Sequence, residues 1–223
     1  MFTGLIRHQG KLLQRNSNLQ GVELVFSCVD LKDKLKLGDS LAINGVCQTI
    51  TKMEGDIFYV QAVWVTLEKT TLGKLITESN LNLERPLCLG DSLDGHLCLG
   101  HVNGLACLTK KESLGENRLL WFKLPENLFK KCVAEGPISL DGIALTVAYI
   151  KNDSHEIAVS IIPFTWEHTN LHQLAVGDEV NVETDFFYNY AQQILESMEQ
   201  KLEQKLEQKL EQKLGRKLRE WHE

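Results

Sequence analysis

Three side chains have the chemistry of catalytic groups in settings that would let them use it. Cys47 follows a tight Asn-Gly turn and is a candidate nucleophile, or alternatively a small apolar residue of the core. His101 lies in a Gly-His-Val-Asn-Gly segment, where glycines let a ligand approach the backbone closely. Asp185 precedes Phe186-Phe-Tyr188 and is either an acid or base beside aromatic rings or the cap of a following helix. For each residue, the catalytic and the structural interpretation both stay open.

The chain lacks the sequence signatures of several common enzyme classes. It contains no phosphate-cradling glycine-rich loop, no Ser-His-Asp order and no dinucleotide-binding fingerprint. Its six cysteines include no Cys-x-x-Cys pair and are too sparse for a disulfide scaffold. His96, Cys98 and His101 are close in sequence, but three or four ligands at zinc spacing do not converge there, so no metal site is expected.

Composition and charge argue against nucleic-acid and membrane functions. Of the 223 residues, 43% are hydrophobic and 24% are charged, which is enough apolar material to bury a core. The net charge of -6 offers no basic stripe for nucleic acid. No apolar run approaches the roughly 18 to 20 residues that span a bilayer, and the N-terminus lacks the pattern of a secretory signal. The expected location is therefore cytoplasmic.

The elements that must position these side chains centre on a duplicated hairpin, residues 40–50 and 139–147. Each copy is an apolar run, a two-residue turn and a second apolar run that carries a threonine. The turns are Asn44-Gly45 and Asp141-Gly142, and both dipeptides favour tight hairpins because they tolerate positive φ. One copy has Cys47 where the other has Ala144, which predicts two related domains with different tasks.

Other repeats extend this duplication over most of the chain. Thr66-Leu-Glu-Lys-Thr-Thr-Leu72 recurs as Thr165-Trp-Glu-His-Thr-Asn-Leu171, and Asn82-Leu-Glu84 recurs as Asn181-Val-Glu183. Short runs with a period near two, separated by Gly-Asp or Gly-Glu turns, are typical of a β-sandwich or barrel. The repeats therefore predict two homologous all-β domains.

The predicted division is 1–93, 94–187 and a C-terminal helix, 188–223. Helical character begins near Ile194, and from Glu199 the tail consists of Glu-Gln-Lys-Leu units, whose composition favours a helix. Its apolar residues repeat every four positions, so their stripe drifts around the helix axis. Two interpretations stay open: a solvated tail, or a short self-associating segment within residues 194–206.

A series of distinctive motifs runs through residues 1 to 188. In chain order they are Met1-Phe-Thr-Gly-Leu-Ile6, Gly38-Asp-Ser-Leu-Ala-Ile-Asn-Gly-Val-Cys47, Thr70-Thr-Leu-Gly73, Asn82-Leu-Glu-Arg85, Gly95-His-Leu-Cys-Leu-Gly-His-Val102, Asp141-Gly-Ile-Ala-Leu-Thr-Val147, and Ile162-Pro163 with Thr165. In content and order they resemble riboflavin synthase of the alpha-chain type, the two-barrel lumazine-binding family. The resemblance implies an all-β fold of two homologous six-stranded Greek-key β-barrels in tandem plus a C-terminal α-helix.

The resemblance also implies an activity, that of a transferase. Two molecules of 6,7-dimethyl-8-ribityllumazine would exchange a four-carbon unit, giving riboflavin and 5-amino-6-(ribitylamino)uracil in the last step of riboflavin biosynthesis, with no metal or redox cofactor. Each barrel would hold one lumazine. The family implies a homotrimer formed through the C-terminal helix, in which the N-terminal barrel of one subunit meets the C-terminal barrel of its neighbour, and an association with lumazine synthase. A lumazine- or flavin-binding relative without turnover is the alternative.

Site residues are carried over from the family by position. The implied catalytic set is Cys47 as nucleophile or proton relay, His101 in proton transfer, Asp185 as the carboxylate that adds to the lumazine or orients a nucleophile, and Phe2 with Ser40. The implied substrate contacts are Thr3, Gly4, Leu5, Ile6, Gln48, Thr49, Gln61, Ala62, Val63, Trp64, Val65, Thr66, Gly100, Val102, Glu135, Ala144, Leu145, Thr146, Ser160, Ile161, Ile162, Pro163, Phe164 and Thr165. Backbone amides of Gly4-Leu5 and Gly100-His101 are expected to reach the ring edge.

The sequence departs from the family pattern at several of these positions. Ala144 stands where the second hairpin usually carries serine, which removes a hydroxyl group from the ligand site. Gln48 replaces the usual leucine, and Glu135 stands where a lysine is common. Val65 and Phe164 stand where glutamate or histidine is frequent. Losing one hydroxyl contact costs on the order of 1 kcal/mol, so the expectation is weaker binding with the reaction retained.

Overall fold

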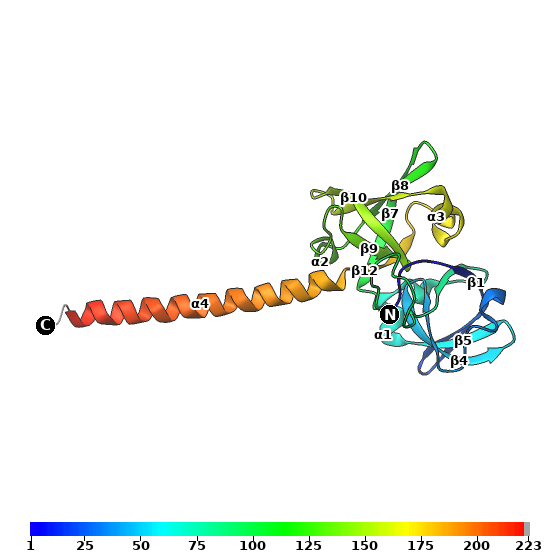
Figure 1. The fold of residues 1–223 in the computed structure, drawn as a ribbon, viewed down its shortest axis with the longest axis horizontal. Helices are drawn as coiled ribbons and strands as arrows, with labels where there is room; N and C mark the ends of the chain where they lie inside the picture. The colour runs from blue at the N-terminus through cyan, green and yellow to red at the C-terminus, as the bar shows by residue number, and fades with distance from the viewer. Residues whose placement is uncertain (221–223) are drawn as a thin grey trace. The chain divides into compact units, whose positions relative to one another are not determined.

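Residues 1–220, which the computed structural model describes, form two closed six-stranded β-barrels and a long C-terminal helix (Figure 1). In barrel 1 the strands are antiparallel and neighbour one another in the order β1-β2-β5-β4-β3-β6, with β6 closing onto β1. The strands are β1 (His8–Asn18), β2 (Gly21–Ser27), β3 (Ser40–Ile43), β4 (Val46–Glu54), β5 (Ile57–Val63) and β6 (Asn80–Glu84).

Barrel 2 repeats this topology strand for strand. Its order is β7-β8-β11-β10-β9-β12, with β12 closing onto β7. The strands are β7 (Gly104–Leu114), β8 (Asn117–Lys123), β9 (Pro137–Leu140), β10 (Ile143–Lys151), β11 (Glu156–Ile161) and β12 (Glu179–Thr184). The prediction of two homologous Greek-key barrels followed by a helix is confirmed.

Each barrel is filled by its own hydrophobic core. In β5 the alternate residues Phe58, Val60 and Ala62 are fully buried, as expected for a strand with one face on a core. Phe26 stacks on Phe58 with ring centroids 5.6 Å apart. The register shifts between Leu12 and Gln14 in β1, and equivalent shifts occur in β4, β7 and β10. Such bulges increase the local twist and bend that let a six-stranded sheet close on itself.

Short helices follow corresponding strands in the two barrels. Thr70 and Thr169 cap the last short helix in each barrel, because their hydroxyl oxygens accept from the amides of Leu72 and Leu171 at 3.3 and 3.4 Å. After β5 come α1 (Trp64–Lys69) and η2 (Thr71–Lys74), after β11 come α3 (Pro163–Glu167) and η3 (Asn170–Gln173), and the others are η1 (Val29–Leu31) and α2 (Glu126–Phe129).

The two hairpin turns lie back to back where the barrels meet. Asn44 and Gly45 have φ of 46° and 76°, and Asp141 and Gly142 have φ of 47° and 79°, as a tight Asx-Gly hairpin requires. A Cβ atom placed on Gly45 would lie 2.6 Å from the amide nitrogen of Gly142, and the reverse distance is also 2.6 Å. Glycine is therefore required at both tips for conformation and for close approach.

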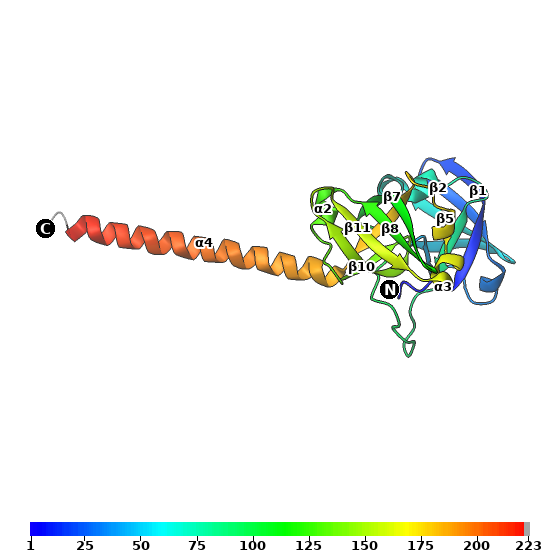
Figure 2. The same cartoon turned by 90° about the horizontal axis from the view of Figure 1, so that it is seen from above.

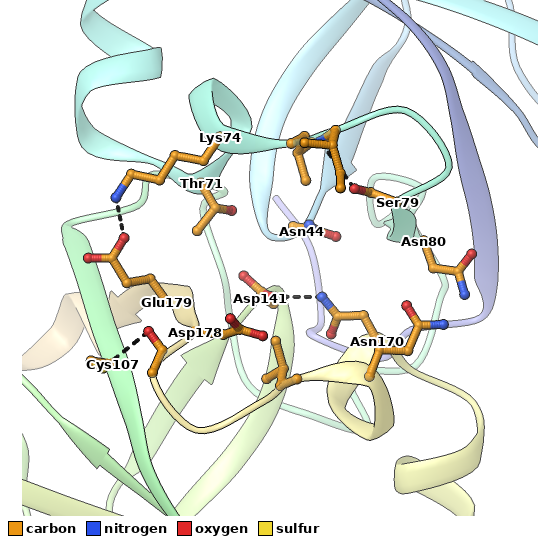
Figure 3. A pocket seen from close by; sticks show the side chains of 15 residues that line it. Asn44, Thr71, Lys74, Ser79, Asn80, Cys107, Asp141, Asn170, Asp178 and Glu179 are labelled. Carbon is orange, nitrogen blue, oxygen red and sulfur yellow. Dashed lines mark hydrogen bonds and ion pairs between the residues drawn. The ribbon is translucent and has the colours of Figure 1, made fainter.

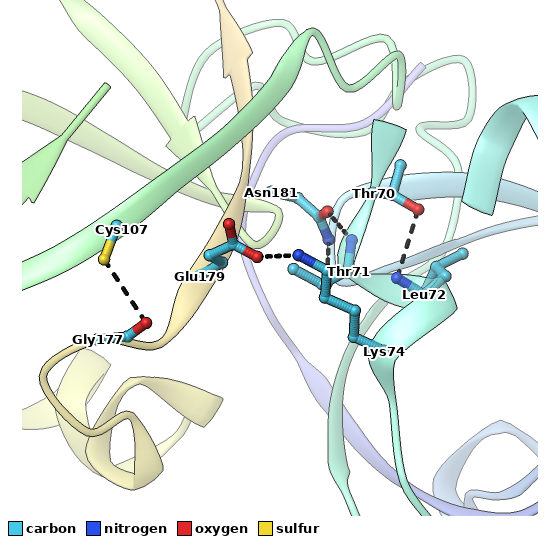
Figure 4. A network of polar contacts seen from close by, with 8 residues as sticks. All are labelled: Thr70, Thr71, Leu72, Lys74, Cys107, Gly177, Glu179 and Asn181. Atoms are coloured by element: carbon cyan, nitrogen blue, oxygen red, sulfur yellow. Dashed lines mark hydrogen bonds and ion pairs between the residues drawn. The ribbon is translucent and has the colours of Figure 1, made fainter. Parts of the chain in front are cut away.

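A buried amide network surrounds the tips and joins the barrels. Asn181 of barrel 2 donates through Nδ2 to Oγ1 of Thr71 at 2.9 Å, and its Oδ1 accepts from the Thr71 amide (Figure 4). The same Nδ2 also donates to the carbonyl of Asn44 at 2.8 Å. Asn82 of barrel 1 makes the reciprocal contacts with the Asp141 carbonyl and with Asn170. Because buried polar groups are costly when unpaired, this reciprocal pairing fixes how the two barrels dock.

The chain divides into two compact units, residues 1–185 with both barrels and the segment from Phe186 onward. That segment forms α4 (Phe186–Glu220), the long helix of Figure 2. It starts before the predicted boundary at 188 and before Ile194, where the helical pattern of the sequence begins. The predicted tail 188–223 extends beyond the helix to 221–223, which lie outside the described residues. Among the described helices, none has an apolar stretch that could cross a bilayer.

Candidate active site

Three polar residues predicted for the first barrel lie together on the outer face of its hairpin. Thr49 of β4 pairs with Ser40 of β3, and Cys47 pairs with Ala42. The intervening residue Gln48 is buried, and its side-chain Nε2 donates to the carbonyl of Cys47 at 2.8 Å. Because side chains alternate along a strand, Cys47 and Thr49 share the face opposite Gln48. Thr49 is exposed and Cys47 is half-buried, so both can be reached by a ligand.

The chain segment that leads into barrel 2, residues 99–102, lies on the hairpin of barrel 1; we call it the second strap. The carbonyl of Gly100 accepts from the Cys47 amide at 3.0 Å, and a Cβ atom on Gly100 would lie 2.7 Å from Cβ of Cys47. Val102 packs against the core of barrel 1. His101, whose side chain is exposed, is the residue between these two anchors, so the backbone of the second strap holds it near Cys47.

The N-terminal segment, residues 3–6, makes the mirrored contact with barrel 2; we call it the first strap. The carbonyl of Gly4 accepts from the Ala144 amide at 2.7 Å, and Ile6 packs against the core of barrel 2. Leu145 also packs against that core, whereas Thr146 is exposed on the outer face of β10. Each predicted ligand site therefore combines the hairpin of one barrel with the strap that precedes the other.

Two buried glutamates hold the straps. Glu84 at the end of β6 accepts from the amide of Thr3 at 2.6 Å, its hydroxyl at 2.7 Å and the amide of Gly4 at 3.0 Å. Glu183 in β12 accepts from the amides of Leu99 and Gly100 at 2.6 and 3.0 Å. Burial raises the pKa of both carboxyl groups, and these amide hydrogen bonds partly oppose the shift.

These hydrogen bonds bear on the prediction that strap amides reach the ring edge of a ligand. The amides of Gly4 and Gly100 already donate to carboxylates, and both glycine carbonyls already accept from a hairpin amide. In this arrangement a ligand at either strap would meet the side chains of Leu5 and His101 and the hairpin face. The ring-edge contact stays a prediction that must compete with the glutamates.

Apolar side chains at the ends of β5 and β11 are exposed beside each hairpin. Val65 is 62% exposed and Phe164 64% exposed, and Val63, Trp64 and Ile162 are about half exposed. The pairing of β4 with β5 reaches Ile50 and Val60, the residues next to Thr49 and Gln61, so this apolar group adjoins the hairpin face. Large exposed apolar groups of this kind commonly mark binding surfaces.

Other residues predicted for substrate contact have different surroundings. Ala62 and Ile161 are core residues, so only their backbone could meet a ligand. Gln61 exchanges side-chain hydrogen bonds with Asn18, and Thr66 and Thr165 each accept through the carbonyl from the capping threonine at 2.7 Å. Three more predicted contacts lie at the surface: Ser160 and Glu135 are exposed and Pro163 is half-buried.

Phe2 lies in the interior, between the straps. It is 1% exposed, exchanges both backbone hydrogen bonds with Cys98, and packs with Ala42, Cys98 and Cys47. Cys98 lies 3.4 Å from Nε2 of His96, and burial raises the pKa of its thiol to about 12, so it stays protonated. Burial lowers the pKa of His96, while nearby Asp185 opposes that shift. Phe2 therefore packs beneath Cys47 and Ala42 of the hairpin, and its side chain is not exposed to a ligand in this structure.

Neither hairpin face forms part of the cavity beside the barrel junction. This cavity of about 510 Å³ is lined by Asn44, Asp141 and Asn170 and by the ion pair of Lys74 with Glu179 (Figure 3). A second cavity, of about 460 Å³, includes Thr3, Leu5 and Glu84 and so adjoins the first strap. Among the side chains that the structure describes, no group of three His, Cys, Asp or Glu residues could hold a metal ion.

Comparison with known proteins matches this architecture. The family model of the lumazine binding domain matches twice, at residues 3–86 and 99–185, one match per barrel. The chain is 32% identical to riboflavin synthase of Actinobacillus pleuropneumoniae, covering 87% of this chain and 90% of the relative. It is 31% identical to riboflavin synthase of Bacillus subtilis (strain 168), covering 90% and 92%. The chain belongs to the riboflavin synthase family.

Solved structures with the same fold are also found. The crystal structure of LumP complexed with 6,7-dimethyl-8-(1'-D-ribityl) lumazine has a TM-score of 0.74 at 24% identity, covering 83% of this chain and 99% of LumP. The LumP complex with riboflavin has a TM-score of 0.75 at 23% identity, covering 83% and 100%. At this identity the likeness supports the two-barrel fold of the riboflavin synthase family member described here, and nothing beyond the fold.

Sequence reasoning gave no role to Glu84 or Glu183, the residues that hold the straps in this riboflavin synthase family member. The repeated Asn-x-Glu motif marks both positions but not their partners, because those partners are backbone amides that lie 81 and 84 residues away in the chain. His96 and Cys98 were noted only as neighbours of His101. The catalytic and binding assignments themselves stay predictions, to which the structure adds the placement of each residue.

Proposed function

We propose that this chain catalyses the dismutation of two 6,7-dimethyl-8-ribityllumazine molecules into riboflavin and 5-amino-6-(ribitylamino)uracil, as a transferase. The observation that carries the proposal is its identity of 31% and 32% to riboflavin synthases over about nine-tenths of both lengths. The match spans both barrels, as a reaction between two copies of one substrate requires. Holding two heterocycles in reactive register removes much of the entropic barrier to their reaction.

The two hairpin faces divide the remaining chemistry. The face with Cys47 and Thr49 offers a thiol, and the second strap that lies on it carries the exposed imidazole of His101; these groups are suited to nucleophilic addition and proton transfer. The face with Ala144 and Thr146 offers the exposed hydroxyl group of Thr146, while the hydroxyl of Ser139, which pairs with Ala144, is buried. We assign the first face to chemical activation and the second to holding the partner molecule, with Asp185 as the carboxylate that supports one of the two steps.

Assembly is part of the same proposal. Neither hairpin face is enclosed by the described residues of one chain. We propose that the exposed apolar residues beside each face contact a neighbouring subunit, and their exposure supports this. The side chains of Ile194, Leu195, Met198, Leu202, Leu206 and Leu210 on α4 are all more than half exposed. We propose a homotrimer held through α4, with 1–93 and 94–187 as the lumazine-binding domains, a cytoplasmic location, and association with lumazine synthase.

The activity is tested by incubating the purified protein with the lumazine alone and following riboflavin at its long-wavelength absorbance. Riboflavin is expected to appear without any added cofactor. Stoichiometric binding of the lumazine without colour would overturn the enzyme and favour the non-catalytic relative. Cys47→Ser is expected to lower kcat by at least about tenfold, as loss of a proton-transfer group does. Cys107→Ser is the matched control, because Cys107 is also half-buried but lies in barrel 2, away from the hairpin of barrel 1.

The assembly is tested by truncation. Deleting the residues after Tyr190 is expected to lower the number of subunits per assembly, measured by sedimentation equilibrium, because it removes the exposed apolar residues of α4. The mass of the truncated protein would remain that of the full-length assembly, less the deleted residues, if the barrels alone held the subunits together. That result would contradict the role of α4.

A further inference from the structure

We propose that Glu84 and Glu183 are a pair of positioning residues, each of which aligns the strap that completes the ligand site on the opposite barrel. Glu84 belongs to barrel 1 but holds the first strap, which lies on the hairpin of barrel 2. Glu183 belongs to barrel 2 but holds the second strap, which lies on the hairpin of barrel 1. This proposal rests on the proposed function and names the residues that make its two sites dependent on both barrels.

The carboxylate of Glu183 fixes two successive amides of the second strap with separate oxygens. Oε1 accepts from Leu99 at 2.6 Å and Oε2 accepts from Gly100 at 3.0 Å. The carbonyl of Gly100 itself accepts from the Cys47 amide, so Gly100, the residue before His101, is held through both its N–H and its C=O groups. With Gly100 fixed in this way, Glu183 sets how the backbone of His101 is presented to Cys47.

Glu84 repeats the arrangement for the first strap. Its Oε1 and Oε2 accept from Thr3 and Gly4, and the Gly4 carbonyl accepts from the Ala144 amide. Both glutamates are 6% exposed, so neither carboxylate is balanced by bulk water. A buried carboxylate that accepts several amide hydrogen bonds is a stronger and more directional anchor than a neutral acceptor.

The need for a carboxylate, not just for a polar side chain, follows from the donors it meets. Every named partner of Glu84 and Glu183 is an N–H or O–H donor. A glutamine in the same place has one oxygen and one NH₂ group, so one strap amide would face another donor and lose its acceptor. The expected result is a strap that is released at one amide while the strand and the barrel core remain intact.

The test compares Glu84→Gln and Glu183→Gln in the full-length protein, with Glu156→Gln as the matched control. Glu156 accepts side-chain hydrogen bonds from Thr109 and Ser154 in barrel 2 and touches neither strap. Hydrogen exchange by mass spectrometry is expected to show faster exchange at residues 99–101 in Glu183→Gln only and at residues 3–5 in Glu84→Gln only. The control is expected to exchange like the wild type at both straps.

Binding and kinetics then separate positioning from mere stability. Because the site with Cys47 and His101 carries the proton transfers, Glu183→Gln is expected to lower kcat at least tenfold. Glu84→Gln is expected to raise KM with a smaller change in kcat. It should also raise about tenfold the dissociation constant of riboflavin at the site on the hairpin of barrel 2. Equal changes in kcat and KM for both variants, or wild-type exchange and binding in both, would overturn the proposal. If a glutamine variant does not fold, Glu→Asp at the same position keeps the charge and shortens its reach.

The outcome is separable from that of the proposed function. A wild-type protein that binds riboflavin but makes none from the lumazine would overturn the proposed activity, while the exchange and binding measurements would still decide the role of the glutamates. Conversely, wild-type turnover with no effect of either glutamine substitution would leave the activity standing and remove the positioning role.

Discussion

Barrel 1 and barrel 2 have the same strand order, the same bulges and the same capping threonines, but their hairpin tips differ. In barrel 1 the tip carries Asn44, whose Oδ1 accepts from the Asn82 amide at 2.8 Å. In barrel 2 the tip carries Asp141, whose two oxygens accept from the Asn181 amide and from Nδ2 of Asn170. Asn170 stands in barrel 2 where the repeat in barrel 1 has Thr71. The carboxylate of Asp141 and the amide group of Asn170 that donates to it are therefore found in the same barrel.

The comparison continues on the outer face of the hairpins. Cys47 and Ala144 occupy equivalent positions, and each donates its amide to the glycine of a strap. The backbone interactions are therefore kept in both barrels, while the side chains on the predicted ligand face have diverged. A duplicated scaffold can thus offer two unlike sites to two copies of one molecule without any change of fold.

The largest expected effect comes from placing a side chain between the tips. Gly45→Ala and Gly142→Ala are each expected to destabilise the protein by about 3 kcal/mol, because the new Cβ atom overlaps the opposing backbone and alanine is strained at positive φ. The free energy of unfolding from urea titration is the measurement. Gly55→Ala, at φ of 68° with nothing within 4 Å, is the control and should cost only about 1 kcal/mol. Equal losses at all three positions would mean that the tips do not pack as described.

The buried acid at one tip gives a pH dependence that the other tip lacks. Burial raises the pKa of Asp141 to about 6, so the folded state binds its proton more tightly than the unfolded state does. Its stabilising contribution is therefore complete below about pH 4 and is lost as the pH rises through about 6. Over this window Asp141→Asn should gain roughly 2 to 3 kcal/mol relative to the wild type. The difference in unfolding free energy between the two proteins, measured against pH, cancels the titration of other groups.

The reciprocal variant sharpens this result. Asn44→Asp places a carboxyl group at the tip of barrel 1, where the neighbouring repeat position holds Thr71 instead of the amide donor Asn170. The stability that this variant loses above pH 6 should therefore exceed the loss caused by Asp141 in the wild type. A constant difference between Asp141→Asn and the wild type from pH 4 to 7 would contradict the raised pKa.

The sequence predicted the hairpins and the fold well because both depend on local signals. The dipeptides Asn44-Gly45 and Asp141-Gly142 specify turns with positive φ, and alternating apolar residues specify strands. The start of α4 lies earlier than the predicted boundary at 188, since Phe186-Phe-Tyr188 has no helical periodicity of its own. The crossed straps could not be predicted, because they depend on backbone hydrogen bonds between Gly4 and Ala144 and between Gly100 and Cys47. Backbone groups leave no mark in residue types, so a role for the glutamates that bind them was equally hidden.

A smaller effect is expected from restoring a hydroxyl group to the second hairpin face. Ala144→Ser should strengthen riboflavin binding by about fivefold, the equivalent of one hydrogen bond of about 1 kcal/mol. Equilibrium fluorescence titration measures the affinity. Ala148→Ser, also half-buried on β10 but within the cluster around Trp121, is the control and should leave the affinity unchanged. An equal gain in both variants would indicate a general effect and not a site contact.

The smallest effect is expected at the rim of the junction. Lys74 of barrel 1 pairs with Glu179 of barrel 2, and the side chain of Lys74 is largely exposed. Lys74→Gln should therefore reduce stability by less than about 1 kcal/mol, and the loss should shrink in high salt. Urea titrations at low and high ionic strength check this. A loss as large as that in Gly45→Ala would show that the ion pair, and not the tips, holds the barrels together.

The back-to-back tips also determine which changes a linked pair of barrels can accept. Gly45 and Gly142 approach as two copies of one residue would across a two-fold axis, so identical single-barrel chains could make the same contact as a homodimer. In such a homodimer every change at a tip would occur twice, and a buried acid would be placed beside its own copy. Covalent linkage of the halves removes that restriction, and a lone carboxylate, Asp141, can then lie beside the tip that carries Asn44.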